Sequence, residues 1–281
     1  MEPIIFALAA MLLWGVGDFL IHRSVRESGV ALSLFATALV GTIALAPWAI
    51  PTLGSLTLPY WLFFIALGAL LTLAAILDFK ALEIGKLGIV EIIFCVEIPV
   101  TAALAVWLHG DIISWYQGII MIALLAGMLL LFFEKFSLRS VLERGAVLAF
   151  AGAVTMGFVN FLTADASQRT TAILAIWLPG IVLLVSSGVW LIKSGVRSAV
   201  SNVKLAWKAL LLMAVIDTAA WVCYAYATSA GETAITTAIT QGYPAIALVL
   251  GVRFNHERFA KHQWAGAAIT FIAAILLAVS M

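Results

Sequence analysis

Residues 14–20 read WGVGDFL, and residues 156–162 read MGFVNFL, 142 positions later in the chain. Three of these seven residues are identical, and Asp18 corresponds to Asn160. Two further matches, at a spacing of 145, join Phe79 to Tyr224 and Pro99 to Pro244. The sequence therefore indicates an internal duplication, in which loop insertions account for the drift in spacing.

The composition indicates that this protein is surrounded by lipid. Of its 281 residues, 64% are apolar and only 10% are charged, which is less than half the charged share of an ordinary soluble domain. Because so few charges cannot cover a soluble protein of this length, the sequence predicts an all-α integral membrane protein. A net charge of +1 also argues against a nucleic-acid partner, which requires a strong positive field.

Ten apolar runs are long enough to cross the hydrocarbon as helices, which takes about 20 residues each. They are residues 4–21, 30–50, 59–77, 88–108, 113–133, 145–163, 171–192, 208–228, 233–252 and 262–280. The duplication divides them into five plus five, and because five is odd, the second copy must enter the membrane from the opposite side. The sequence thus predicts ten transmembrane helices in two inverted five-helix repeats, which are characteristic of alternating-access transporters.

Lysine and arginine mark one side of the predicted membrane. Fourteen of the 15 lie in the odd-numbered loops between these runs, and only Arg169 lies in an even-numbered loop. Since cytoplasmic loops carry the excess of basic residues, we expect a multi-pass protein of the cell membrane with both termini outside the cytoplasm.

The third of these loops divides the chain. We assign residues 1–136 to the first repeat, 137–144 to a cytoplasmic joint and 145–281 to the second repeat. In the fourth loop, helical spacing of apolar residues predicts a short helix lying in the membrane interface. These residues are Val196, Val200, Val203 and Trp207.

Several loose motifs recur in both halves in the same order. They are Trp14-Gly15, Phe79 with Ala81 and Leu82, the prolines Pro99 and Pro244, and the turns Gly110-Asp111 and His256-Glu257. With them, the whole chain resembles the EamA-type transporters of the drug/metabolite transporter superfamily. The resemblance implies a secondary transporter of amino acids, metabolites or toxic compounds, with helices of both halves around a central cavity and the last helix of each half at the periphery. Such proteins are commonly described with cytoplasmic termini, and here we follow the charges instead.

Acidic residues within the apolar runs are candidates for function, because a charge at mid-helix costs about 2.5–3.5 kcal/mol on insertion scales. Glu97 and Asp217 lie near the middle of their runs. Since burial disfavours the charged form of a carboxylic acid, we expect one of these two candidates to exchange a proton during transport. Asp18, Asp78 and Glu91 lie nearer the cytoplasmic ends, where the alternative is an interfacial carboxylate paired with Arg23, Lys80 or Lys86.

Acidic residues share a helix face with aromatic rings at two places. The sets are Asp217, Trp221, Tyr224 and Thr228, at spacings of four, three and four, and Trp14 with Asp18. A carboxylate beside aromatic faces suits an organic cation, so we expect a small substrate that bears an amine. Asn160 stands at the position of Asp18 in the second repeat and joins this candidate binding site. The alternative is that the rings simply pack between helices.

The run 233–252 carries a polar stripe. Thr233, Thr237 and Thr240 share a face with Gln241 beside them, and Pro244 interrupts the backbone hydrogen bonds near mid-membrane. Freed carbonyls and hydroxyls there, with Thr237 and Gln241 foremost, are candidates for binding polar groups of the substrate. The alternative is a hydroxyl seam between helices. In the last run a seam of small residues favours close packing, formed by Gly266, Thr270, Ala274 and Ala278.

The sequence indicates no cofactor, metal or catalytic site. Its four histidines show no zinc spacing, and neither GxSxG nor a phosphate-binding GxxxxGK occurs. We expect an exporter of small polar metabolites, driven by an ion gradient, with protons as a candidate, or by the substrate's own gradient. The alternatives are an uptake carrier for an amine or amino acid and, from other classes, an intramembrane enzyme or a non-transporting scaffold.

Overall fold

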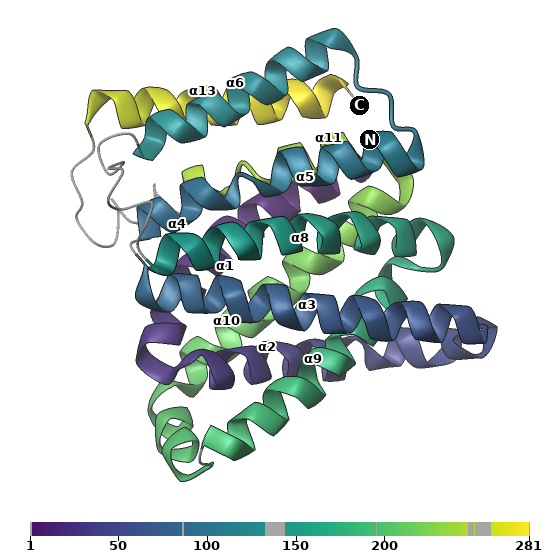
Figure 1. The fold of residues 1–281 in the computed structure, drawn as a ribbon, viewed down its shortest axis with the longest axis vertical. Coiled ribbons are helices and arrows are strands. Elements are labelled where there is room, and N and C mark those ends of the chain that lie inside the picture. Colours follow the sequence, from purple (N-terminus) through teal and green to yellow (C-terminus); the bar gives the residue numbers. More distant parts are fainter. Residues whose placement is uncertain are drawn as a thin grey trace.

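The computed structural model describes residues 2–85, 87–132, 144–194, 196–246, 250 and 260–280, without the side chains of residues 87, 88, 132 and 196–205. The elements are helical throughout these ranges (Figure 1). They are α1 (Glu2–Ser28), α2 (Val30–Ala49), η1 (Ile50–Ser55), α3 (Leu58–Ile84), α4 (Leu87–Phe94), α5 (Glu97–Leu104), η2 (Ala105–His109), α6 (Trp115–Phe132), α8 (Arg144–Arg169), α9 (Ala172–Ser194), α10 (Val196–Ala230), α11 (Thr233–Thr240) and α13 (Lys261–Ser280). The predicted joint up to residue 143 and the His256-Glu257 turn lie outside the described residues.

Eight helices in the described ranges are long and apolar enough to span a membrane. A further apolar helix, Trp115–Leu131, is shorter. The predicted run 233–252 begins with α11 and is described continuously only as far as Ile246. The prediction of an all-helical membrane protein is therefore confirmed, while the count of ten stays a prediction.

The fourth predicted span is a broken helix. Its two parts, α4 and α5, are separated by a turn at Cys95 and Val96. Pro99 has no N–H to donate to the carbonyl of Cys95, and the N–H of Ile98 donates to this carbonyl instead, at 3.1 Å. The proline therefore accounts for the break.

The ninth predicted span breaks in the same way. α11 ends at Thr240, and the N–H of Gly242 donates to the carbonyl of Ile239 at 3.1 Å. Pro244 lies two residues beyond this turn. The interruption that the sequence predicted at Pro244 is thus confirmed.

The two halves of the chain pack helix against helix. α1 packs mainly on α10 and α3 mainly on α8, while α2 packs on α9 and α6 on α13. Two glycines allow close approach to the broken helices: a Cβ added at Gly15 would lie 2.5 Å from Cβ of Ile246, and one at Gly157 would lie 2.6 Å from Val100. The first helix of each half therefore rests on the broken helix of the other half.

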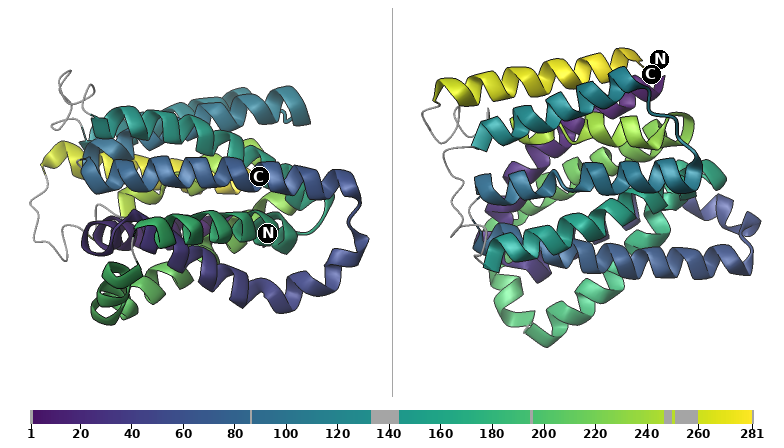
Figure 2. Two further views of the ribbon diagram at one scale, coloured as in Figure 1. Left: turned by 60° about the horizontal axis from the view of Figure 1, so that its bottom comes forward. Right: turned by 45° about the horizontal axis from the view of Figure 1, so that its top comes forward.

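Both chain termini lie at the same end of the bundle (Figure 2). The segment that begins at Val196 is helical as predicted, but it continues into the span as one helix of 35 residues, α10. No proline or glycine occurs between Val196 and Lys208 to end the helix. The predicted segment is therefore part of a longer helix and not an element of its own, and its place in the membrane interface stays a prediction.

α6 and α13 lie side by side at one edge of the bundle (Figure 1). A Cβ added at Gly266 would lie 2.6 Å from the carbonyl oxygen of Gly127, and one at Gly127 would lie 2.7 Å from Oγ1 of Thr270. The small-residue seam predicted for the last run is thus confirmed at Gly266 and Thr270, where two helices approach backbone to backbone.

Gly127→Ala is expected to destabilise the protein by about 1–3 kcal/mol, because the added methyl group has no room at this crossing. Gly118 provides a matched control in the same helix, since an added Cβ there meets nothing within 4 Å. Gly118→Ala should leave stability unchanged or raise it by about 0.5–1 kcal/mol. Thermal unfolding in detergent measures both variants, and equal effects would contradict the close crossing.

Candidate substrate cavity

A cavity lies between the two halves of the chain. Most of its wall comes from α1, α2, α3 and α5 of the first half and from α8, α9 and α10 of the second. It has an empty volume of about 1230 Å³, including the part open to solvent. α6 and α13 contribute no described residue to the wall. The central cavity and the peripheral last helices that the family resemblance implied are therefore both present.

Four carboxylates line the cavity: Asp18, Asp78, Glu97 and Asp217. They come from α1, α3, α5 and α10, so both halves contribute. Among the described lining residues there is no Lys, Arg or His. Because low-dielectric walls strengthen the field of such charges, a site of this kind favours a cationic group and disfavours an anion.

Glu97 is held by two amide side chains. Its Oε2 accepts a hydrogen bond from Nδ2 of Asn160 at 2.9 Å and another from Nε2 of Gln241 at 2.7 Å. All three residues are buried. The contact joins α5 of the first half to α8 and to the break after α11 in the second half. Two N–H donors on one oxygen suit a carboxylate, which accepts but does not donate.

Four aromatic rings gather beside the cavity. The ring centroid of Trp14 lies 5.2 Å from that of Trp221, 5.5 Å from that of Tyr224 and 6.4 Å from that of Tyr243. Three of these rings line the cavity, those of Trp14, Trp221 and Tyr243. The Trp14 indole also interacts with the Asp217 carboxyl group. The cavity wall therefore combines aromatic rings with carboxylates, the two kinds of group that bind organic cations.

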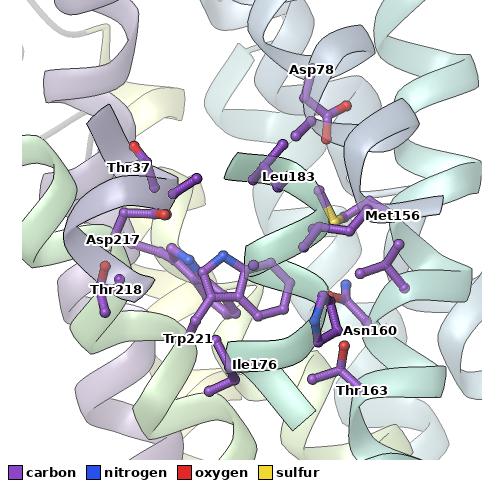
Figure 3. Close-up of a pocket in the computed structure, with 18 of the residues that line it drawn as sticks. Thr37, Asp78, Met156, Asn160, Thr163, Ile176, Leu183, Asp217, Thr218 and Trp221 are labelled. Carbon is purple, nitrogen blue, oxygen red and sulfur yellow. The ribbon is translucent and has the colours of Figure 1, made fainter. Parts of the chain in front are cut away.

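Trp221 occupies a central place in the cavity. Figure 3 shows its indole between Asp217 and Thr37 on one side and Asn160 and Thr163 on the other. Polar groups therefore flank an apolar ring on both sides.

Seven of the residues that the sequence singled out lie together in this wall. They are Trp14, Asp18, Glu97, Asn160, Asp217, Trp221 and Gln241. The sequence selected these residues from three separate patterns: acids within apolar runs, acids that share a helix face with aromatic rings, and the polar stripe of the run 233–252. The fold brings residues from all three patterns into one cavity wall.

Tyr224 and Thr237 lie behind the wall and not in it. The Tyr224 hydroxyl donates to the carbonyl of Asn160 at 3.1 Å and lies 2.9 Å from Oγ1 of Thr237. Both side chains are buried. Nε2 of Gln168 likewise lies 3.4 Å from the hydroxyl of Thr233. These contacts match the alternative in which the threonines of α11 join helices.

Asp78 and Glu91 are buried in the helix bundle. Asp78 is 7% exposed and Glu91 is 1% exposed. Within the described part of the chain, Oδ1 of Asp78 and both side-chain oxygens of Glu91 have no hydrogen-bond partner. Both acids are therefore enclosed by the protein, and neither is exposed at its surface.

The expected basic partners make other contacts. Arg23 pairs with Glu27 at 2.8 Å, and the ammonium of Lys80 lies 5.5 Å from the ring centroid of Trp190. Side chains two residues apart on a helix point in different directions, so Lys80 cannot form an ion pair with Asp78 on the same helix. Lys86, the third expected partner, lies outside the described residues.

Several lining residues gave no signal in the sequence. Thr37 and Thr42 of α2 and Thr218 of α10 line the cavity, as does Trp177 of α9. The indole N–H of Trp177 donates to the carbonyl of Thr42 at 2.9 Å. Single hydroxyls in an apolar run are common in membrane helices, and only the packing of α2 on α9 and α10 brings these residues to the cavity.

Comparisons with known proteins agree with this architecture. One solved structure, described only as "Crystal structure of protein", matches with a TM-score of 0.72 and 15% identity, covering 99% of this chain and 98% of that one. At this identity the likeness concerns the fold alone. No curated protein matches the chain.

The model of the EamA-like transporter family matches residues 1–133 and again residues 143–279. Together the two matches cover nearly the whole chain. The chain therefore belongs to the EamA-like transporter family and is a membrane transporter of the drug/metabolite transporter superfamily.

Proposed function

We propose that this transporter moves small metabolites that bear an amino or quaternary ammonium group, such as amino acids or amines, by alternating access. Export is the proposed direction. The observation that carries the proposal is the lining of the cavity, which combines four carboxylates with aromatic rings and has no basic residue among its described members. Sugars, nucleotides and plain carboxylates are expected to be poor ligands of such a lining.

Asp18 and Asp217 are proposed to bind the cationic group, with Trp14 and Trp221 supplying ring faces. In both pairs the tryptophan stands four residues from the acid on its own helix. The opposite pole of the substrate, a hydroxyl or carboxylate, is assigned to Asn160 and Gln241. In this proposal Tyr224 and Thr237 hold the wall in place and do not contact the substrate.

Alternating access rests on the proposed inverted repeats, residues 1–136 and 145–281. Three observations support them: the family model matches twice, the α1–α10 contact mirrors the α3–α8 contact, and Gly15 and Gly157 each seat a broken helix of the other half. If the two repeats are exchanged, the α1–α10 contact becomes the α3–α8 contact, and Gly15 takes the place of Gly157. Such a symmetric pair has two equivalent ways of closing the cavity.

The proposed location is the cell membrane, with both termini outside the cytoplasm. Fourteen of the 15 Lys and Arg residues fall in the odd-numbered loops that the sequence predicts, and both termini lie at the same end of the bundle. Protons are the proposed coupling ion, with Glu97 and Asp217 as the acids that exchange them.

Thermal unfolding of the purified protein with a metabolite panel tests the proposed substrate class, because a ligand that binds only the folded state raises its stability. Amino acids and amines are expected to raise the unfolding temperature of the wild type and not that of Asp217→Asn. Stabilisation by sugars, nucleotides or carboxylates without stabilisation by amines would contradict the proposal.

A further inference from the structure

A fifth buried acid, Glu91 of α4, lies outside the cavity wall. It is 1% exposed, and neither side-chain oxygen has a hydrogen-bond partner among the described residues. Glu97, six residues later, instead accepts hydrogen bonds from Asn160 and Gln241. The two glutamates therefore have opposite surroundings, one with donors for a negative charge and one without.

The titratable groups that interact electrostatically with Glu91 disfavour a negative charge on it. They are Asp18 of α1, Asp78 of α3, Glu97 of α5, Cys95 in the break and Tyr243 after α11. None of these groups is a cation, and no described Lys, Arg or His offsets the three carboxylates around Glu91. A carboxylate buried without a donor or a counter-charge is strongly destabilised, and such a group binds a proton instead.

We propose that Glu91 holds a proton while the cavity is empty, so that the proton and the substrate occupy different acids. Glu97, with its two N–H donors, is a carboxylate in this state. Three of the acids around Glu91 line the cavity, namely Asp18, Asp78 and Glu97. The protonation of Glu91 therefore responds to any charge that enters the cavity, although Glu91 itself does not contact the substrate.

This response provides coupling, and it rests on the proposed amine substrate. A cation that enters beside Asp18 offsets the negative charge near Glu91. The O–H bond of Glu91 then breaks and its electron pair stays on the Glu91 carboxylate. The proton passes to the carboxylate of Glu97, which lines the cavity and releases the proton to water. One positive charge enters as another leaves, which is the exchange that an amine–proton antiporter requires.

Infrared spectroscopy of the purified full chain in lipid vesicles tests the proton on Glu91 without a substrate. A protonated carboxyl group has a C=O stretching band distinct from the bands of a carboxylate. We expect such a band at neutral pH, reduced by the contribution of one carboxyl group in Glu91→Gln and undiminished in Glu97→Gln. Glu27→Gln, at an exposed position, is the control for removing a carboxylate elsewhere.

Isotope labelling keeps the test decisive where Glu91→Gln fails to fold. In the Glu97→Gln background, carbon-13 in the glutamate carboxyl groups should shift the part of the band that Glu91 contributes, and carbon-13 in the aspartate carboxyl groups should leave that part in place. A band of undiminished intensity in folded Glu91→Gln, or one that does not respond to labelled glutamate, would overturn the proposal.

Choline tests the proposed coupling between cation entry and proton release from Glu91, because choline is a cation whose ammonium group has no proton to release. Saturating choline is expected to remove the Glu91 band at neutral pH. A band that persists although choline stabilises the wild type against heat would overturn the coupling. Absence of any stabilisation by choline or the amines would count against the proposed amine cavity, and the assignment of the proton to Glu91 would stand on the ligand-free spectra.

Discussion

Glu97→Gln is expected to reduce substrate accumulation against a gradient to background, while counterflow exchange of substrate continues. Glutamine keeps the size of the side chain and a hydrogen-bonding oxygen for Asn160 or Gln241, but it cannot bind or release a proton. The coupling step therefore fails while the cavity persists. Proteoliposomes with an imposed pH gradient measure accumulation, and the same vesicles preloaded with substrate measure counterflow.

Asp217→Asn is the companion variant, and Glu27→Gln, at a position outside the cavity wall, is the control that should transport like the wild type. Accumulation that stays at the wild-type level in both Glu97→Gln and Asp217→Asn would remove protons on these residues from the mechanism. Loss of counterflow as well as accumulation in Glu97→Gln would show instead that its bonds to Asn160 and Gln241 are needed to hold the cavity together.

Trp221→Ala should weaken the binding of a cationic substrate by about 0.5–2 kcal/mol, because the cation loses a ring face in a site with little water. This corresponds to about a two- to thirty-fold rise in Kd. Trp221→Phe should weaken binding less, since a smaller ring remains. Isothermal titration of the detergent-solubilised protein with the strongest ligand of the thermal screen gives these values.

Tyr226 provides the matched control on the same helix. Its ring stacks on Phe6 with centroids 5.3 Å apart and does not line the cavity. Tyr226→Ala is therefore expected to leave the Kd unchanged. A Kd that stays at the wild-type value in both Trp221→Ala and Asp217→Asn would contradict the assignment of the cation to these residues. The membership of the transporter family would not be affected.

Much of the fold can be predicted from this sequence because lipid imposes simple requirements on each span. Apolar runs of about 20 residues predict the spans one by one, and prolines predict breaks because their effect on the helix is local. The helices extend beyond the predicted runs, as α1 does to Ser28 and α10 from Val196. Apolar content marks the hydrocarbon, whereas a helix ends only where its backbone is broken or capped.

The site was predictable only in part. Helical spacing correctly grouped Asp217 with Trp221, but it also included Tyr224, which faces a neighbouring helix and not the cavity. Spacing defines one face of a helix, and in a bundle that face borders both a cavity and other helices. The contact of Glu97 with Asn160 and Gln241 joins three distant segments, so no local pattern could reveal it.

Glu91 illustrates the same limit. Its position near the predicted end of the span allowed an interfacial ion pair as an alternative, yet the residue is buried and interacts with other acids. Depth along a helix axis can be read from the sequence, but direction around the axis depends on which helices pack there.

Counterflow by the wild-type protein in vesicles, with substrates that differ only in charge, tests the amine assignment most directly. Each set contains an amino acid, the amine left when its carboxyl group is removed, and the carboxylic acid left when its amino group is removed. The acidic cavity predicts that labelled amino acid or amine exchanges across the membrane and that the matched carboxylic acid neither exchanges nor competes. Exchange of the carboxylic acids without exchange of the amines or amino acids would contradict the proposed substrate class.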